Sequence, residues 1–449
     1  MSQSDSPNPS PLDRLDQDKR DIKRGSTLSI LGFLVRLSAR VPFLLIAGRL
    51  YGTSTYGEYV LLTAIVETIA LLSTFGLKRT IFNFIAEGDE HKDSHKDGHA
   101  DNPMIVRHAL ILGLGLSLLL VALVQILARP ILSFFDAENI LSSLILLSWA
   151  IPFISLTDIC LSATLSQRLL RYEIIVRSFV EPISLTVLSF AFFYAGFKDA
   201  GLVYAFLCAF GLAAVFSLSF CHFVFTWRRI ICGPINVSQL ILMAKNSAYT
   251  CLHDMVRVLV SRIDTFAVGY FFSTSAVGIY GMAQQFLTIV EKIALSFYPM
   301  LMPVVASAVR DGDRHRLLQQ LWSAAKRLLI LQLPIVALFF FAGKEILGLI
   351  GQEFVAAWPV LMILSLGCLI NAVLQLVEVP LTYMRPHINV IAGVAAIVLY
   401  VLGITSMQTA FGVNGIALTS VTATFMANIG LVILFSRSRL KEKNETQKI

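Results

Sequence analysis

The sequence predicts an all-α, polytopic membrane protein with about twelve transmembrane helices, arranged in two parallel six-helix bundles. Three observations predict this fold class: the composition, the placement of basic residues, and an internal repeat. Of the 449 residues, 56% are hydrophobic and only 14% are charged. Apolar runs of about 20 residues, long enough to cross a bilayer, recur along the whole chain. This composition excludes a disordered chain or a disulfide scaffold and argues against a soluble enzyme.

Twelve apolar segments are long enough to form transmembrane helices. We expect an N-terminal bundle over residues 25–227, a cytoplasmic linker at 228–246 and a C-terminal bundle over 247–436, between a polar, disordered tail at 1–24 and a basic tail at 437–449. The expected helices are 25–50, 56–77, 104–128, 138–163, 174–196, 200–226, 247–272, 277–305, 321–342, 354–378, 387–408 and 412–436.

Basic residues are distributed unevenly between the two sides of these segments. With a cytoplasmic N-terminus, the loops and helix turns on the cytoplasmic side contain 27 Lys and Arg residues. The opposite side contains only Arg49, Arg129, Lys198 and Lys344. Because cytoplasmic loops are enriched in Lys and Arg, this asymmetry predicts that both termini are cytoplasmic. Membrane topology therefore accounts for the formal net charge of +7, and no nucleic-acid partner is expected.

The two halves of the sequence match each other at an offset of 221 residues. Between residues 31 and 59 the match gives eight identities in 29 ungapped positions. The central stretch is GRLYGTSTYGEY in the first half and GYFFSTSAVGIY in the second. Chance similarity between apolar helices explains shared Leu and Val, but it explains the shared Gly, Thr-Ser, Tyr and Arg poorly. The repeat predicts two bundles related by an axis along the membrane normal, which is typical of transporters with a site between the halves.

Two stretches of the chain resemble the lipid-linked oligosaccharide flippases of polysaccharide biosynthesis. The first consists of GRLYGTSTYGEY, an apolar helix and then GLKRTIFNFIAE, and the second is SRIDTFAVGYFFSTSAVGIYGMAQQF. This family belongs to the superfamily that also contains multidrug and toxin extruders and lipid II flippases. The resemblance implies that the substrate is an oligosaccharide linked to undecaprenyl pyrophosphate and that the chain moves it across the bacterial inner membrane. Glycosyltransferases and a glycan polymerase would then be partners.

Four arginines lie deep inside the expected helices. Arg36 and Arg40 are one turn apart on the first helix, roughly 21 and 15 Å below its outer end. Arg257 is the repeat equivalent of Arg36 on the seventh helix, and Arg262 lies higher on the same helix. Because an arginine facing lipid costs ~2.5 kcal/mol or more, all four should face the interior or water. We interpret them as a cationic substrate site, since Arg binds phosphate groups with paired hydrogen bonds.

The alternative role for these arginines is internal ion pairing with buried acids. The candidates are Asp158, Asp254, Asp264, Glu67 and Glu291. Asp264 lies about 10 Å along the helix axis from Arg257, so it should pair with another helix or act as a cation or proton site. Glu67 and Glu291 lie near the middles of the second and eighth helices, where either carboxyl group could take part in ion coupling or in structural pairing.

No motif in the chain indicates catalysis, a cofactor or a metal. Walker, HExxH and GxSxG patterns are absent, and the six cysteines form no CxxC pair. His91, His95 and His99 have the spacing of metal ligands on a helix, but the glycines and aspartates of the loop at 88–102 favour a solvated loop. Two alternatives to a flippase stay open. A cation-coupled multidrug exporter would need an acidic cavity, and a membrane-embedded polymerase or ligase usually needs a longer outer loop.

Overall fold

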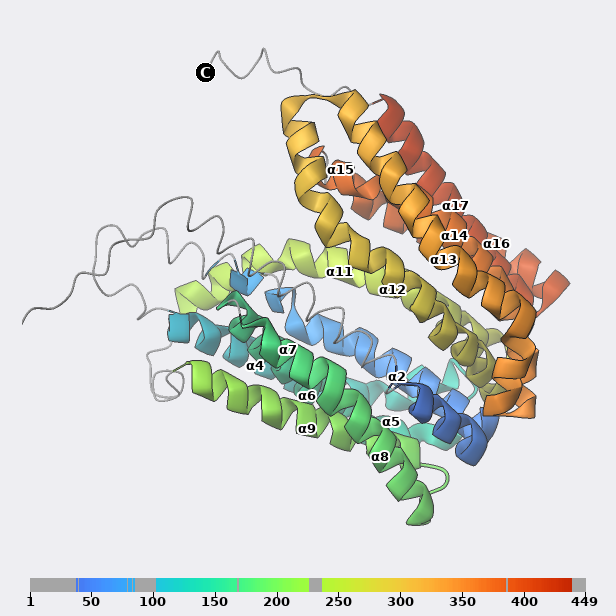
Figure 1. The fold of residues 1–449 in the computed structure, drawn as a ribbon. Coiled ribbons are helices and arrows are strands. Elements are labelled where there is room, and N and C mark those ends of the chain that lie inside the picture. The colour runs from blue at the N-terminus through green and yellow to red at the C-terminus, as the bar shows by residue number, and fades with distance from the viewer. Residues whose placement is uncertain are drawn as a thin grey trace, which may run out of the picture.

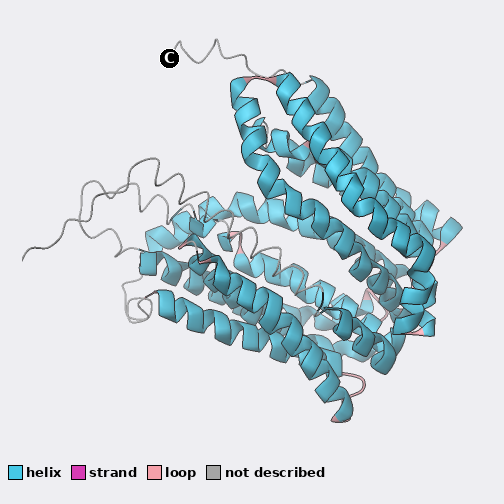
Figure 2. Cartoon of the chain, in the orientation of Figure 1, coloured by secondary structure: helices cyan, strands magenta, loops and turns pink. Residues whose placement is uncertain are grey.

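The computed structural model describes residues 38, 40–78, 80–82, 84, 102–167, 169–225, 236–384 and 387–437. Within these residues the chain is helical and contains no strand (Figure 2). The predicted all-α fold class is therefore confirmed. We refer to the described residues up to 225 as the N-terminal half and to residues 236–437 as the C-terminal half.

The N-terminal half begins with a helical segment from Arg40 to Ile46 that runs into a π-helix. Gly52 then has a φ of 76°, a conformation that suits glycine, and separates this segment from the next helix. The elements of this half are η1 (Ala47–Tyr51), α2 (Gly52–Thr74), α4 (Asn102–Ser133), η3 (Glu138–Ile140), α5 (Leu141–Ser148), α6 (Ala150–Ser166), α7 (Leu170–Ile174), the π-helix η4 (Ile175–Val180), α8 (Glu181–Tyr194) and α9 (Gly201–Val224).

The C-terminal half contains longer helices joined by short turns. The Asn236 side chain accepts hydrogen bonds from the backbone N–H groups of Ser238 and Gln239 and so caps the first of these helices. The Asp313 side chain caps the third helix in the same way, through the N–H of Arg316. The elements are α11 (Val237–Phe271), α12 (Thr274–Asp311), α13 (Arg314–Ile350), η5 (Gln352–Ala357), α14 (Trp358–Gln375), α15 (Glu378–Met384), α16 (His387–Phe411) and α17 (Val413–Arg437).

Every expected transmembrane segment overlaps helix, but several boundaries differ. α11 begins ten residues before the expected residue 247, and α13 extends beyond both ends of 321–342. Hydropathy marks the stretch that lies in lipid, whereas helices continue past the bilayer until a cap ends them. By length and hydropathy, nine helical spans of the described chain can cross a membrane. α11 and α12 are not among these nine spans, and they contain charged residues that face the space between the two halves.

The two halves are in contact at one end of the molecule and diverge toward the other. Figure 1 shows them converging where α2 begins and α13 ends. We call this end the closed end, and the end at which Thr74, Val237 and Asp311 lie the open end. The asymmetry of basic residues predicts that the open end is cytoplasmic.

Backbone packing between α2 and α12 holds the closed end together. A Cβ atom added at Gly57 would lie 1.8 Å from the carbonyl oxygen of Thr274, and one added at Gly278 would lie 2.2 Å from that of Thr53. Gly57 is aligned with Gly278 in the repeat, and Thr53 with Thr274. The two repeat-related glycines therefore let the two helices approach symmetrically, as small residues do between helices in membranes.

Hydrogen bonds and aromatic packing complete the closed end. The Ser275 hydroxyl donates to the Thr53 Oγ1 (2.9 Å), and the Thr53 hydroxyl donates to the Glu353 carboxylate (2.7 Å). The Arg49 Nε donates to the Leu349 carbonyl (2.6 Å). Tyr56, which is fully buried, packs edge-on against Phe354 with ring centroids 6.0 Å apart. The largest buried cluster of the molecule includes this region and draws side chains from both halves.

The first part of α11 packs on the N-terminal half although its sequence belongs to the second repeat. The backbone N–H of Asn236 donates to Nε2 of the buried His108 on α4 (3.0 Å). A Cβ atom at Gly76 would lie 2.7 Å from the carbonyl oxygen of Ser247. α11 thus crosses from one half to the other, and its middle turns border the space between them (Figure 1).

Candidate functional site

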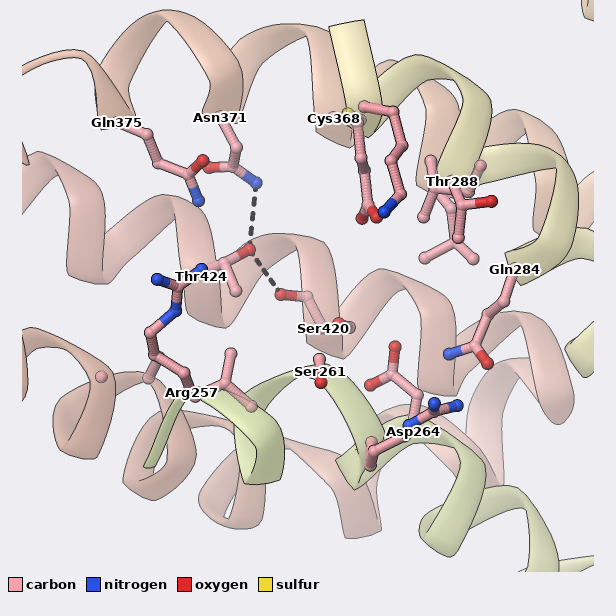
Figure 3. A pocket seen from close by; sticks show the side chains of 18 of the residues that line it. Arg257, Ser261, Asp264, Gln284, Thr288, Cys368, Asn371, Gln375, Ser420 and Thr424 are labelled. Carbon is pink, nitrogen blue, oxygen red and sulfur yellow. Dashed lines mark hydrogen bonds between the residues drawn. The ribbon is translucent and has the colours of Figure 1, made fainter. Parts of the chain in front are cut away.

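A cavity of about 1330 Å³ lies between the two halves, on the open side of the closed end. Its walls come from the Arg40–Ile46 segment, α2, η4, α8 and α9 of the N-terminal half and from α11, α12 and α14–α17 of the C-terminal half. In an inverted or parallel repeat transporter, the substrate site lies at this position between the repeats. Figure 3 shows part of the cavity wall that the C-terminal half contributes.

Two predicted arginines, one from each half, line the cavity without an ion-pair partner. Among the residues that the structure describes, no carboxylate lies within 4 Å of the guanidinium of Arg40 or Arg257. Arg40 precedes the π-helix η1, and Arg257 lies on α11 with its side chain exposed to the cavity. Glu378 lies close enough to Arg257 to interact electrostatically, but not as a direct pair. No described carboxylate is therefore paired directly with either guanidinium group, and both face the space that an anion could occupy.

The third predicted arginine has a partner in the opposite half. Arg262 on α11 forms a salt bridge with Glu67 on α2, and both side chains are about one-third exposed at the cavity wall. For Glu67 and Arg262 the structure therefore shows the internal ion pairing that the sequence left open. The pair therefore joins α2 to α11 at the cavity wall.

Asp264 is buried and belongs to a polar group within the C-terminal half. It is 6% exposed, and the Tyr280 hydroxyl donates a hydrogen bond to its carboxylate (2.9 Å). Tyr400 and Ser420 also lie near this carboxylate. A buried carboxylate is costly unless it is hydrogen-bonded, so this group explains how Asp264 is tolerated inside the protein. Glu291, the remaining predicted acid, faces the cavity beside Lys292.

Arg177, which lies near the start of the expected helix 174–196, is a cavity arginine that was not among the predicted site residues. It lies in the π-helix η4 and forms salt bridges with Asp158 and with Glu181 (2.8 Å to the latter). Lys78 also lies 3.7 Å from Asp158. In the topology prediction, Arg177 is one of the cytoplasmic basic residues because it lies near a helix start. In the structure it reaches the cavity wall because the helix extends further than the apolar run. π-helical turns often mark functional positions in helices.

The cavity wall contains acidic as well as basic side chains. Among the described residues, five basic and five acidic side chains line it. The prediction considered the arginines of the helix interiors but not Glu181 and Glu378, which lie near helix starts and also face the cavity. Among the described lining residues, Arg40 and Arg257 have no carboxylate within 4 Å. The five basic residues are Arg40, Arg177, Arg257, Arg262 and Lys292, and the acidic ones are Glu67, Glu181, Asp264, Glu291 and Glu378.

Several predicted features lie outside the described residues: Arg36, residues 88–101 of the His-containing loop, the tail at 1–24, residues 228–235 of the linker and residues 438–449 of the basic tail. In the part of the chain that the structure describes, no group of three or more His, Cys, Asp or Glu side chains has the arrangement of a metal site. Of the other predicted acids, Asp158 forms a salt bridge with Arg177, and Asp254 lies 3.4 Å from His253.

The fold resembles that of several solved transporters. A lipid II flippase, MurJ, in an inward closed conformation matches with a TM-score of 0.73 and 16% identity, over 92% of this chain and 87% of the flippase. An inward-facing multidrug resistance MATE family transporter of the MOP superfamily matches with a TM-score of 0.70 and 14% identity, over 90% and 97%. The Vibrio cholerae MATE transporter VcmN in its bent form matches with a TM-score of 0.56 and 14% identity, over 93% and 96%. At these identities the likeness concerns the fold.

The nine apolar spans and the cavity between the halves define a multi-pass membrane protein that has the fold of these transporters. A family model described as polysaccharide biosynthesis protein matches residues 46–359, which is more than half of the chain. The chain therefore belongs to the polysaccharide biosynthesis protein family. No curated protein matches the sequence.

Proposed function

We propose that this protein moves an oligosaccharide linked to undecaprenyl pyrophosphate across the bacterial inner membrane, by alternating access and without changing the substrate chemically. The observation that carries this proposal is the pair Arg40 and Arg257, one from each half, whose guanidinium groups face one cavity without a direct acidic partner. Arg holds phosphate oxygens through paired, charge-assisted hydrogen bonds. A pyrophosphate held by both groups would contact both halves at once.

Alternating access requires that the cavity be exposed to one side of the membrane at a time. The symmetric contact of Gly57 and Gly278 seals one end, and the cavity lies on the other side of this seal. Rocking of the two halves about the cavity would open the seal and close the opposite end. The distribution of basic residues supports cytoplasmic termini, so the state described would receive substrate from the cytoplasmic side.

Transport without catalysis is supported by the connections at the closed end. Within the described residues, α9 follows α8 after the short turn Ala195–Ala200, and α12 follows α11 after only Phe272 and Ser273. Such turns leave no room for an extracytoplasmic catalytic domain. The apolar helices would lie in the lipid bilayer. Glycosyltransferases would supply the substrate, and a glycan polymerase would consume it.

A cation-coupled multidrug exporter is the second candidate. The observation that favours it is the equal number of acidic and basic side chains in the cavity wall, because an organic cation would be attracted by unpaired acids. Two of these acids, Glu67 and Glu181, are already paired with arginines, which makes the anionic substrate the better match.

Deletion of the gene in its host separates the two candidates. A flippase predicts loss of the surface glycan and accumulation of the complete lipid-linked oligosaccharide, with unchanged mass, in the inner leaflet. Expression of the intact protein should restore export. Normal surface glycan together with increased sensitivity to cationic drugs would instead identify a drug exporter.

A further inference from the structure

The two walls of the cavity differ in side-chain chemistry. All amide side chains that line it, among the described residues, come from the C-terminal half: Gln284, Gln285, Asn371, Gln375, Asn389 and Asn428. All Phe and Tyr side chains that line it come from the N-terminal half: Phe43, Tyr59, Phe206 and Phe210. One wall therefore offers many neutral donors and acceptors, and the other offers aromatic faces.

Hydrogen bonds between α14 and α17 fix part of the amide wall. The Asn428 Nδ2 donates to the Asn371 Oδ1 (3.1 Å), and the Asn371 Nδ2 donates to the Thr424 Oγ1 (3.0 Å). Asn371 and Thr424 are only partly buried, whereas Asn428 is 7% exposed. The amide of Asn371 has a second N–H and a second lone pair that these bonds leave available. Its orientation is thus set before any ligand arrives.

The position of Gln375 is not explained by contact between helices. Polar side chains often hold transmembrane helices together, and that role accounts for Asn428, Asn371 and Thr424. Gln375 lies one turn after Asn371 on the same face of α14, lines the cavity, and makes no hydrogen bond with any described residue. In Figure 3 its amide, that of Asn371 and the guanidinium of Arg257 all point into the same part of the cavity. An amide without a partner in a membrane protein is costly unless water or a ligand binds it.

We propose that Asn371, Gln375 and Thr424 form a sugar subsite, which binds the uncharged sugar attached directly to the pyrophosphate. This inference rests on the proposed function. Neutral amides and hydroxyls complement the hydroxyl groups of a sugar, which both donate and accept hydrogen bonds. Arg257 lies at the edge of the subsite, so a pyrophosphate held there places its first sugar on the amides. The aromatic wall opposite can cover the apolar face of the same ring.

The subsite makes Gln375 and Asn371 specificity-determining residues. Their contribution should appear only when the lipid carries a sugar, whereas Arg257 should contribute with or without it. A neutral hydrogen bond is worth a few-fold in affinity, so each variant should reduce the preference for a glycosylated lipid by about three- to tenfold.

The test measures equilibrium binding of the purified full-length protein to two kinds of probe. One is a bare polyprenyl pyrophosphate, and the other is a set of the same lipid linked to glucose, galactose or N-acetylglucosamine. The variants are Gln375→Leu and Asn371→Leu, with Gln375→Asn and Asn371→Gln to retain the amide. Gln319→Leu is the matched control, because Gln319 is exposed on α13 and lies outside the cavity wall.

The intact protein should bind at least one glycosylated lipid more tightly than the bare lipid. Gln375→Leu and Asn371→Leu should reduce this preference with little effect on the bare lipid, the amide-retaining variants should recover part of it, and Gln319→Leu should preserve it. Equal binding of all probes by the intact protein, or a preference that both Leu variants retain, would overturn the sugar subsite while leaving the pyrophosphate site in place. If no probe binds at all, the proposed function fails, and the subsite fails with it.

Discussion

The closed end and the cavity wall use the same repeat in opposite ways. At the closed end the halves are nearly equivalent, since Gly57 meets Thr274 as Gly278 meets Thr53. In the cavity the equivalence is lost. Tyr280 donates a hydrogen bond to Asp264, whereas its repeat equivalent Tyr59 packs edge-on against Phe43, the equivalent of Asp264, with ring centroids 5.8 Å apart.

This difference indicates which repeat positions must be the same in both halves and which can differ. Backbone contact between α2 and α12 depends on the absence of a side chain, so both copies must have glycine. The cavity has to bind one substrate with different chemical parts, and equivalent positions can therefore differ. The symmetric region would supply the rocking movement, and the asymmetric region would supply the recognition.

The largest effect is expected from a side chain placed at the symmetric contact. Gly57→Leu and Gly278→Leu should each abolish export and lower the thermal midpoint of the solubilised protein by about 5 °C or more, because the clash is with backbone and cannot be relieved by a rotamer change. Differential scanning fluorimetry measures the midpoint. Gly115→Leu is the matched control, since Gly115 is exposed on α4 with no neighbour within 4 Å. Unequal effects at the two glycines would show that the contact is not symmetric.

The next largest effect is expected at the two unpaired arginines. Arg40→Ala and Arg257→Ala should each reduce glycan export by about thirtyfold or more, because each removes a charge-assisted contact worth about 2 kcal/mol. Protein levels in the membrane should stay normal. Arg257→Lys should restore export only partly, since Lys keeps the charge but not the paired geometry. Arg129→Ala, at an exposed position outside the cavity, is the control.

Loss of the protein from the membrane in the Arg40 and Arg257 variants would point to a structural role for these side chains. Normal accumulation with export at the parent rate would show that neither arginine contacts the substrate.

A smaller effect is expected at the ion pair that joins the halves. Glu67→Ala should reduce export several-fold, because it leaves Arg262 without its partner and free to compete for the phosphate. The double variant Glu67→Ala with Arg262→Ala should export better than Glu67→Ala alone. Export measured for both single variants and the double variant gives the coupling between them. Additive losses would mean that the pair does not act as a unit.

The smallest effect is expected from the hydrogen bonds of the closed end. Thr53→Val removes the hydroxyl that joins Ser275 and Glu353, at a cost of about 1 kcal/mol, and should favour opening of this end. In a variant that has Ser261→Cys and lacks the six other cysteines, a membrane-impermeant thiol reagent applied from the outer side should label the cavity faster. Thr53→Ser keeps the hydroxyl and should label at the parent rate. Unchanged labelling in Thr53→Val would assign the seal to backbone packing alone.

The sequence predicts the helices, because hydropathy and helix periodicity depend only on local order. The repeat also identifies Gly57 and Gly278. Other features depend on contacts between distant helices. Arg177 lines the cavity because η4 and α8 continue the helix of α7. Glu181 and Glu378, which lie near helix starts, reduce the positive charge of the cavity wall. The pairing of Glu67 with Arg262 was one of several possible pairs, and no local pattern could select it.

The amide wall illustrates the same limit. Asn371 and Gln375 interrupt an apolar helix, and a lone amide there is more often a contact between helices than a ligand site. Only the arrangement of α14, α17 and α11 around one cavity brings these side chains together with Arg257.

Reconstitution in liposomes tests the central claim most directly. Purified protein would be incorporated into vesicles whose inner leaflet contains a fluorescent undecaprenyl-pyrophosphate-linked oligosaccharide, and the fraction reaching the outer leaflet would be followed by quenching. The account predicts that the intact protein moves the lipid with unchanged mass, that Arg257→Ala vesicles are slower by about thirtyfold, and that Gly278→Leu vesicles match protein-free ones. Equal movement in vesicles with intact protein and without protein would contradict the account, as would recovery of a lengthened or cleaved glycan.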